Sequence, residues 1–121
     1  MFRVSCIQLR SNNNIHSNLD KTSKLIIKAV KQKTDFIITP EVSSHFSLNK
    51  KELLKVCTSM KNDIYLNGIK KLAKKYKKWI LIGSLPIRDG KKLRNRSLLI
   101  GPKGKLIKYY DKINMFDVKI S

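Results

Sequence analysis

Short apolar runs alternate along the chain with longer segments of helical periodicity, and this alternation restricts the fold more than any other feature. Asp35–Thr39 and Trp79–Leu85 are runs of strand length, and each is followed by proline, at Pro40 and Pro86. Because proline cannot donate a hydrogen bond to a neighbouring strand, both strands are expected to end there. A further apolar window, from Val4 to Leu9, predicts the first strand.

The segments between these runs carry their apolar residues at the spacing of a helix. Residues 15–33 predict one helix, with lysines on its outer face and an inner face made of Leu19, Ile26, Ala29 and Val30. Residues 50–78 predict either one helix or two pieces divided near Asn62–Asp63. The inner face of the second piece consists of Ile69, Leu72, Ala73 and Tyr76.

Turn residues in the last third of the sequence predict antiparallel pairing. Gly101-Pro102-Lys103-Gly104 is flanked by two strand-like segments, residues 97–100 and 106–110, and therefore predicts a hairpin. Asp89–Gly90 predicts an earlier turn after the third strand. The whole order predicts an α/β fold whose first strands are parallel and joined by right-handed crossovers. With 121 residues and no repeat or low-complexity linker, a single unit is expected.

The chain is strongly basic, with 27 Lys and Arg against 8 Asp and Glu and a formal net charge of +19. Such a charge favours nucleic acid or an anionic membrane surface as a partner. Lysine supplies most of the excess and is spread over almost every segment, which equally fits a compositional drift toward lysine, asparagine and isoleucine. Lysine pairs lie on one helical stretch, at 70–71, 74–75 and 77–78, but aromatic residues do not alternate with them. Stacking on bases is therefore not indicated, although both interpretations stay open.

The two cysteines indicate neither a zinc site nor a disulfide framework. Cys6 and Cys57 are far apart and lack C-x-x-C or Cys/His spacing. No basic segment followed by a long apolar stretch begins the chain, and no apolar run approaches the ~18 residues of a membrane span. With 41% hydrophobic residues there is enough apolar material for a core. We therefore expect a soluble cytoplasmic protein.

Two polar side chains follow predicted strands closely enough to be candidates for chemistry, since α/β proteins place their sites at the carboxyl ends of parallel strands. Glu41 comes directly after Pro40, where partial desolvation would raise its pKa toward that of a general base. Lys112 follows the last strand among apolar and aromatic neighbours, where a fixed ammonium would stabilise a developing oxyanion. The residue types alone equally allow a solvated carboxylate and a surface lysine.

Five segments occur in an order that is similar to a known pattern. They are Val4-x-x-Ile7-Gln8, Pro40-Glu41 after a strand, Ile82-Gly83-Ser84, Asn95-x-Ser97-Leu98-Leu99-Ile100 with its Gly-Pro-x-Gly turn, and Tyr110-x-Lys112-Ile113-x-x-Phe116-Asp117-Val118. Together they resemble the nitrilase superfamily of carbon–nitrogen hydrolases over essentially the whole chain. The segment around Lys112 is the most specific of the five.

This resemblance implies the N-terminal half of a nitrilase-like, four-layer α-β-β-α sandwich, with residues 1–121 forming a truncated carbon–nitrogen hydrolase domain. The family hydrolyses non-peptide carbon–nitrogen bonds of amides, nitriles or carbamoyl compounds with a Glu, Lys and Cys triad and no metal or organic cofactor. By motif, Glu41 would be the general base that accepts the thiol proton. Lys112 would be the proton donor that stabilises the oxyanion of the tetrahedral intermediate.

The nucleophile implied by the resemblance lies well beyond the lysine, whereas this sequence ends at Ser121. Cys6 falls in the predicted first strand and Cys57 in the helical region, so both are interpreted as small core or helix residues. A second family glutamate, which usually follows the lysine segment, is also absent. We therefore expect no activity from this chain alone.

Half a sandwich leaves one face of its sheet uncovered, which favours pairing with another chain or aggregation. We expect either a split enzyme completed by a separately encoded C-terminal half or the remnant of a decaying gene. A completed enzyme would act on a small-molecule amide or nitrile, and a family-type homo-oligomer is also allowed. The alternative from a different class is a small basic nucleic-acid-binding protein. Substrate and oligomeric state stay open.

Overall fold

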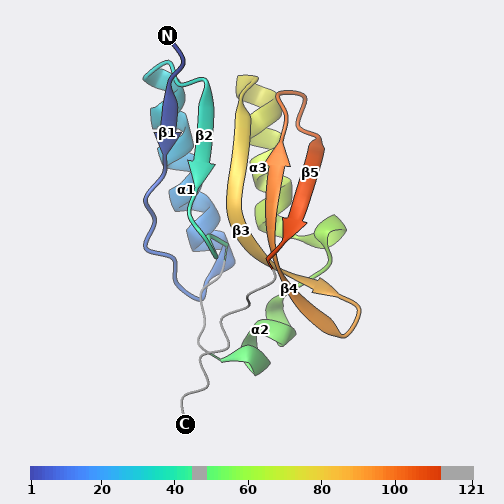
Figure 1. Cartoon of the computed structure of the whole chain (residues 1–121). Coiled ribbons are helices and arrows are strands. Elements are labelled where there is room, and N and C mark those ends of the chain that lie inside the picture. Colours follow the sequence, from blue (N-terminus) through green and yellow to red (C-terminus); the bar gives the residue numbers. More distant parts are fainter. Residues whose placement is uncertain (45–48, 113–121) are drawn as a thin grey trace.

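The computed structural model describes residues 1–44 and 49–112, which form one sheet with helices (Figure 1). In chain order the elements are β1 (Val4–Cys6), α1 (Ile15–Lys31), β2 (Phe36–Thr39), α2 (Lys50–Val56), a 3₁₀ turn (Met60–Asn62), α3 (Ile64–Tyr76), β3 (Trp79–Asp89), β4 (Lys92–Ile100) and β5 (Leu106–Asp111). The predicted helical division near residues 62–63 is confirmed. It is fixed by Asp63, whose side chain accepts a hydrogen bond from the Leu66 amide and so caps α3.

The five strands lie in the order β1-β2-β3-β4-β5. β1, β2 and β3 are parallel, whereas β3, β4 and β5 pair antiparallel, as the sequence predicted. Because β5 runs in the direction of the parallel strands, the ends of β2 and β5 point to the same edge of the sheet. The two residues that follow these strands can therefore approach each other.

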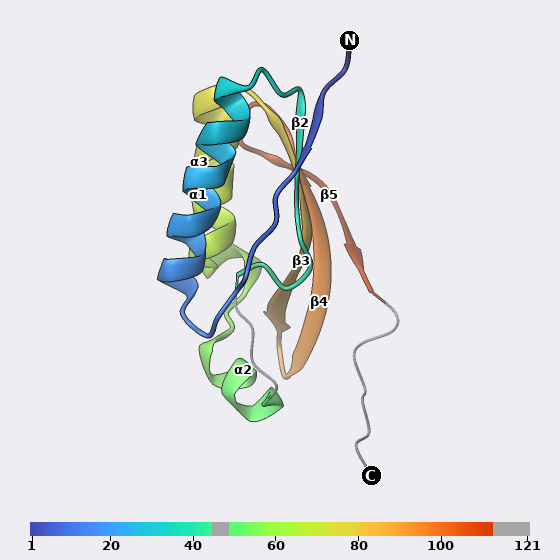
Figure 2. The same cartoon turned by 90° about the vertical axis from the view of Figure 1, so that its left-hand side faces the viewer.

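The long helices α1 and α3 lie side by side on one face of the sheet (Figure 2). Their contact includes a hydrogen bond of 2.8 Å between the Thr22 hydroxyl and the Tyr65 hydroxyl. Completely buried side chains from both layers form the core; the largest include Tyr65, Ile26, Ile37, Leu66, Ile69, Ile80, Ile82 and Leu98. The α/β architecture is thus complete on this side.

The opposite face of the sheet carries mostly apolar side chains, with Lys108 on β5, and is not covered by any helix among the described residues (Figure 2). Strand register places two rows of side chains on it: Val4, Phe36 and Trp79, and beside them Cys6, Ile38, Leu81 and Leu99. Trp79 and Val4 are exposed. The sequence predicted that half of an α-β-β-α sandwich would leave one face of its sheet uncovered, and this is that face.

Two details of the predicted strands are wrong. The third strand does not stop at Pro86 but continues to Asp89, and β4 accordingly begins at Lys92 rather than Ser97. Pro86 lies opposite Asn95, just after a register shift in β3 and past the last residue that pairs with β2. Among residues 1–44 and 49–112, no second strand pairs with β3 at Pro86, and proline is tolerated in strands at such positions.

The first strand is also shorter than predicted, and one cysteine of this strand is not buried as expected. β1 ends at Cys6 rather than Leu9, although the Ile7 amide still donates to the Ile38 carbonyl. Cys6 is exposed on the uncovered face, so it is not a core residue among the described residues. Cys57 is buried at the end of α2, as expected.

Candidate active site

Glu41 lies in the segment that leaves β2 at Pro40. The following residue, Val42, has a positive φ of 49°, which is unusual for a β-branched residue. Its amide donates to the Ser84 hydroxyl over 2.8 Å, and the Ser43 amide donates to the Ser84 carbonyl over 3.2 Å. These bonds attach the segment to β3 and hold its sharp change of direction.

Gly83 allows this segment to cross β3 at close range. A Cβ atom on Gly83 would lie 2.5 Å from the Thr39 carbonyl oxygen and 2.7 Å from that of Pro40. No side chain fits in this space without displacing the backbone. The glycine of the Ile82-Gly83-Ser84 motif therefore has a definite local function, which is to let the end of β2 pass over its neighbour.

Lys112, which contacts Glu41 from β5, is positioned by hydrogen bonds at the end of that strand. Its amide donates to the Asn95 carbonyl over 2.9 Å. The preceding Asp111 accepts two hydrogen bonds from the Arg96 guanidinium, at 2.6 and 3.0 Å. Arg96 also lies 4.1 Å above the ring of Tyr109. The residue before Lys112 is thus fixed by a two-point ionic contact.

The Arg96–Asp111 contact changes the acid–base properties of both groups. Hydrogen bonding to Arg96 holds the pKa of Asp111 below its usual value, and the same contact raises the pKa of Arg96. Both groups are therefore charged throughout the neutral range.

The structure brings Glu41 and Lys112 into direct contact. The Lys112 ammonium donates a hydrogen bond to Oε1 of Glu41, although the two residues are 71 positions apart in the sequence. The Lys112 side chain is 26% exposed, in agreement with the expected partial burial. The Glu41 side chain is 53% exposed, so about half of its surface is open to solvent.

A hollow of about 520 Å³ adjoins Lys112. It lies between α2, the start of β4 and the end of β5, and is lined by Lys50, Leu54, Lys91, Lys92, Leu93, Arg94, Asp111 and Lys112. Its volume falls in the range of small-molecule sites.

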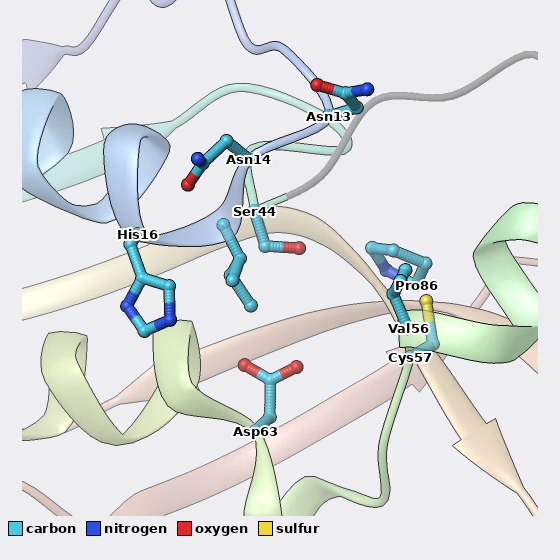
Figure 3. Close-up of a pocket in the computed structure, with 9 residues that line it drawn as sticks. Asn13, Asn14, His16, Ser44, Val56, Cys57, Asp63 and Pro86 are labelled. Atoms are coloured by element: carbon cyan, nitrogen blue, oxygen red, sulfur yellow. The ribbon is translucent and has the colours of Figure 1, made fainter.

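A second hollow, of about 310 Å³, lies on the helical side (Figure 3). His16 from α1, Asp63 at the start of α3 and Cys57 at the end of α2 surround it, together with Pro86. Burial, with a smaller effect of Asp63, raises the pKa of the Cys57 thiol to about 11. Cys57 is therefore protonated near neutral pH, and neither Glu41 nor Lys112 lines this hollow.

No group of three or more His, Cys, Asp and Glu side chains within residues 1–44 and 49–112 is arranged to hold a metal ion. None of the helices in these ranges combines the length and the apolarity needed to span a bilayer.

The sequence interpretation found Glu41 and Lys112 but missed the residues that position them. Ser84 and Gly83 had been noted only as part of a motif, and Arg96 had not been noted. A signal for Arg96 does exist, because an arginine and an aspartate on two strands of a predicted hairpin are natural cross-strand partners. Reading that signal requires the register of the hairpin.

Comparison with known proteins gives several relatives of similar sequence. The chain is 31% identical over 120 residues to the deaminated glutathione amidase of Yersinia enterocolitica, covering 97% of this chain and 41% of that protein. It is 27% identical over 111 residues to the nitrilase and fragile histidine triad fusion protein of Drosophila melanogaster, covering 92% of this chain and 24% of the relative. The chain thus spans less than half the length of these curated relatives.

A solved structure and a family description agree with these relatives. The crystal structure of the C. elegans NitFhit protein matches with a TM-score of 0.85 and 26% identity, over 99% of this chain and 31% of that one. The carbon–nitrogen hydrolase family matches residues 3–121, which is nearly the whole sequence. The chain therefore belongs to the carbon–nitrogen hydrolase family, within the nitrilase superfamily, and corresponds to its N-terminal region.

Proposed function

We propose that residues 1–121 are the N-terminal part of one carbon–nitrogen hydrolase domain and supply two of its three catalytic groups. Glu41 is the general base and Lys112 stabilises the oxyanion. The contact between these two side chains carries the proposal, because the fold brings together the same two residues that the family motifs indicate. The third group, a cysteine, belongs to the polypeptide that completes the sandwich.

The proposed roles follow from the charges of the pair. The Glu41 carboxylate accepts the proton of an incoming thiol, and the thiolate attacks the carbonyl or nitrile carbon of the substrate. The Lys112 ammonium donates a hydrogen bond to the negative charge that develops on the substrate heteroatom. With an amide, the proton held by Glu41 passes to the nitrogen as the carbon–nitrogen bond breaks and ammonia or an amine leaves. Water then hydrolyses the thioester to the acid and restores the thiol.

The uncovered sheet face supports completion by a second half and inactivity of these residues alone. Its apolar rows, which include Trp79 and Leu99, match a surface that another sheet would cover. The only cysteines in these 121 residues are Cys6 in β1 and Cys57 at the end of α2, and Cys57 lines a hollow that neither Glu41 nor Lys112 lines. We place the completed enzyme in the cytoplasm, where a catalytic thiol stays reduced.

The substrate class in this proposal is a small-molecule amide or nitrile. The matched relatives include proteins named deaminated glutathione amidase and omega-amidase, so an amide is favoured over a nitrile. The fusion relative from Drosophila indicates that domains of this family also function joined to another domain.

Co-expression with a complementary C-terminal half that carries the family cysteine tests this function. We expect thiol-dependent release of ammonia from amides by the mixture and none from either half alone. Glu41→Gln and Lys112→Met should abolish most of that release, whereas Lys71→Met, at an exposed position on α3, should leave it unchanged. A stable complex that releases no ammonia from any amide or nitrile would contradict the proposal.

A second candidate, nucleic-acid binding, rests on one observation. Lys71, Lys74, Lys75 and Lys77 are all exposed on and just after α3. A functional site would bind a preferred sequence or structure with a steep dependence on salt, whereas weak and nonselective binding is the by-product of net charge. Binding assays with several nucleic acids at two salt concentrations separate these outcomes.

A further inference from the structure

A group of buried hydroxyls connects the two long helices to the segment that carries Glu41. Its four members are each at most 1% exposed: Thr22 on α1, Thr39 at the end of β2, Ser43 just after Glu41, and Tyr65 on α3. The Thr22 and Tyr65 hydroxyls lie 2.8 Å apart, and those of Thr39 and Ser43 lie 3.3 Å apart. Buried hydroxyls are costly unless they form hydrogen bonds, so each member depends on its neighbours.

The direction of the hydrogen bonds follows from the number of hydrogens. The Thr22 hydroxyl donates to the Asn18 carbonyl over 2.7 Å. Because a hydroxyl has one hydrogen, Thr22 can only accept from Tyr65, and the phenol is the donor of that bond. The Tyr65 oxygen is then left as an acceptor, and the hydroxyls that can donate to it are those of Ser43 and Thr39.

The pKa of Tyr65 reflects the same contacts. Burial raises this pKa, and hydrogen bonding with the side chains of Ser43, Thr22 and Thr39 opposes part of the rise. Tyr65 is therefore a neutral phenol near neutral pH. One hydroxyl group thus contacts both the helical layer, through Thr22, and the segment after β2, through Ser43.

Ser43 is the residue through which this group reaches Glu41. Only Val42, with its positive φ of 49°, separates the two residues. Backbone hydrogen bonds to Ser84 attach this turn to β3, whereas the Ser43 hydroxyl attaches it to the helical layer. A turn with such a backbone persists only where its surroundings hold it, so loss of one attachment is expected to shift the carboxylate.

We propose that Tyr65 is a positioning residue for Glu41: its hydroxyl holds Ser43 and thereby the turn that places the carboxylate beside Lys112. Tyr65 is completely buried, so it acts through Ser43 and not by touching a substrate. The consequence for the reaction rests on the proposed function, whereas the placement of Glu41 beside Lys112 does not.

Removal of one oxygen atom tests this placement in the 121-residue chain. In Tyr65→Phe, carbodiimide coupling of Glu41 to Lys112, detected by mass spectrometry, should fall about threefold or more. Ile69→Val is the matched control, because it removes a methyl group from the same buried face of α3 and leaves every hydroxyl in place. It should lower stability to a comparable degree and leave coupling unchanged. An equal decrease in both variants would overturn the proposal.

A second variant tests whether Tyr65 acts through Ser43. Ser43→Ala should lower coupling as Tyr65→Phe does, and the double variant should lower it no further, because both changes remove the same contact. Additive losses would overturn the proposed route. If Tyr65→Phe does not fold, Ser43→Ala alone replaces it against the same Ile69→Val control.

Kinetics of the completed enzyme link the placement to the reaction. Tyr65→Phe should lower kcat for an amide about tenfold and leave KM within about twofold, since a displaced general base affects the reacting state and not substrate binding. Ile69→Val should leave both unchanged. An unchanged kcat in Tyr65→Phe overturns the positioning role. Absence of ammonia release from the unmodified complex, with coupling still reduced in Tyr65→Phe, contradicts only the proposed function.

Discussion

Asp111 and Lys112 are consecutive residues, yet the ion pairs that they form are of opposite kinds. Asp111 pairs with Arg96 inside the sheet, across neighbouring strands, through two hydrogen bonds. The Arg96 side chain is only 7% exposed and that of Asp111 is 32% exposed. This contact is complete within the described residues.

The neighbouring pair, Glu41–Lys112, is open in the sense that solvent still reaches its carboxylate. Lys112 follows the edge strand β5 and contacts Glu41, which follows β2, three strands away in the sheet. The Glu41 side chain remains half exposed. A single carboxylate oxygen accepts its hydrogen bond. One charged pair fixes the backbone at the end of β5, and the next residue extends its ammonium from that position to Glu41. Under the proposed function, stability and chemistry are therefore assigned to adjacent positions.

The largest effect is expected on catalysis, from changes in the open pair. In the completed enzyme, Glu41→Gln should lower kcat by about 10²–10⁴-fold because the thiol loses its general base. The free energy of unfolding of the 121-residue chain should change by less than about 1 kcal/mol, since an ion pair of this exposure contributes little to stability. Ammonia release and urea unfolding measure the two quantities. A large loss of stability together with an unchanged kcat would show that the Glu41–Lys112 pair stabilises the fold and does not serve the reaction.

The Arg96–Asp111 ion pair, which we call the closed pair, should show the opposite result. Arg96→Met leaves Asp111 without its partner and removes the cation above Tyr109, so we expect a loss of about 2–3 kcal/mol in the free energy of unfolding. Lys24→Met is the matched control, because Lys24 pairs with Asp20 on the exposed surface of α1 and should contribute at most about 0.5 kcal/mol. Urea unfolding of both variants checks this difference, and similar losses would contradict it.

Gly83 tests how the open pair is assembled. In Gly83→Ala the new methyl group would meet the backbone of Thr39 and Pro40, so we expect a loss of about 1–3 kcal/mol and displacement of Glu41. Carbodiimide coupling of Glu41 to Lys112, detected by mass spectrometry, should decrease with it. In the control Gly101→Ala, the nearest atoms belong to the Ile107 and Trp79 side chains, which can move. Unchanged coupling in Gly83→Ala would show that the crossing does not position the pair.

Local sequence was sufficient for most elements, and with the family resemblance it singled out the two residues of the open pair. The alternation of apolar runs with helical segments predicted the parallel strands, because strand and helix periodicity are local properties. Glu41 and Lys112 were singled out because each directly follows a strand, where α/β proteins place sites, and because both fall in the motifs that resemble the family. Their roles remain predictions.

The closed pair and the strand ends were beyond this reasoning, because they depend on pairing between distant segments. Arg96 lies opposite Asp111 only after a register shift within the β4–β5 pair, which residue types alone do not specify. Pro86 continues β3 because β2 has already ended beside it. Cys6 lies in the first strand as predicted, but its exposure could not be predicted, since the sequence of the strand does not specify which face of the sheet the helices cover.

The smallest expected effect is the pH dependence that the closed pair confers. The pKa of Asp111 is lower in the folded chain than its usual value of 3.8, so its stabilisation is present above that value and is lost as pH falls through the folded pKa. Asp111→Asn should therefore be less stable near neutral pH, and its disadvantage should shrink by about 1 kcal/mol on acidification. Asp63, whose pKa burial raises, acts in the opposite sense but is present in both proteins. The difference between the two unfolding curves, measured from about pH 6 to about pH 2, therefore isolates Asp111, and parallel curves would mean that Arg96 does not hold its charge in the folded state.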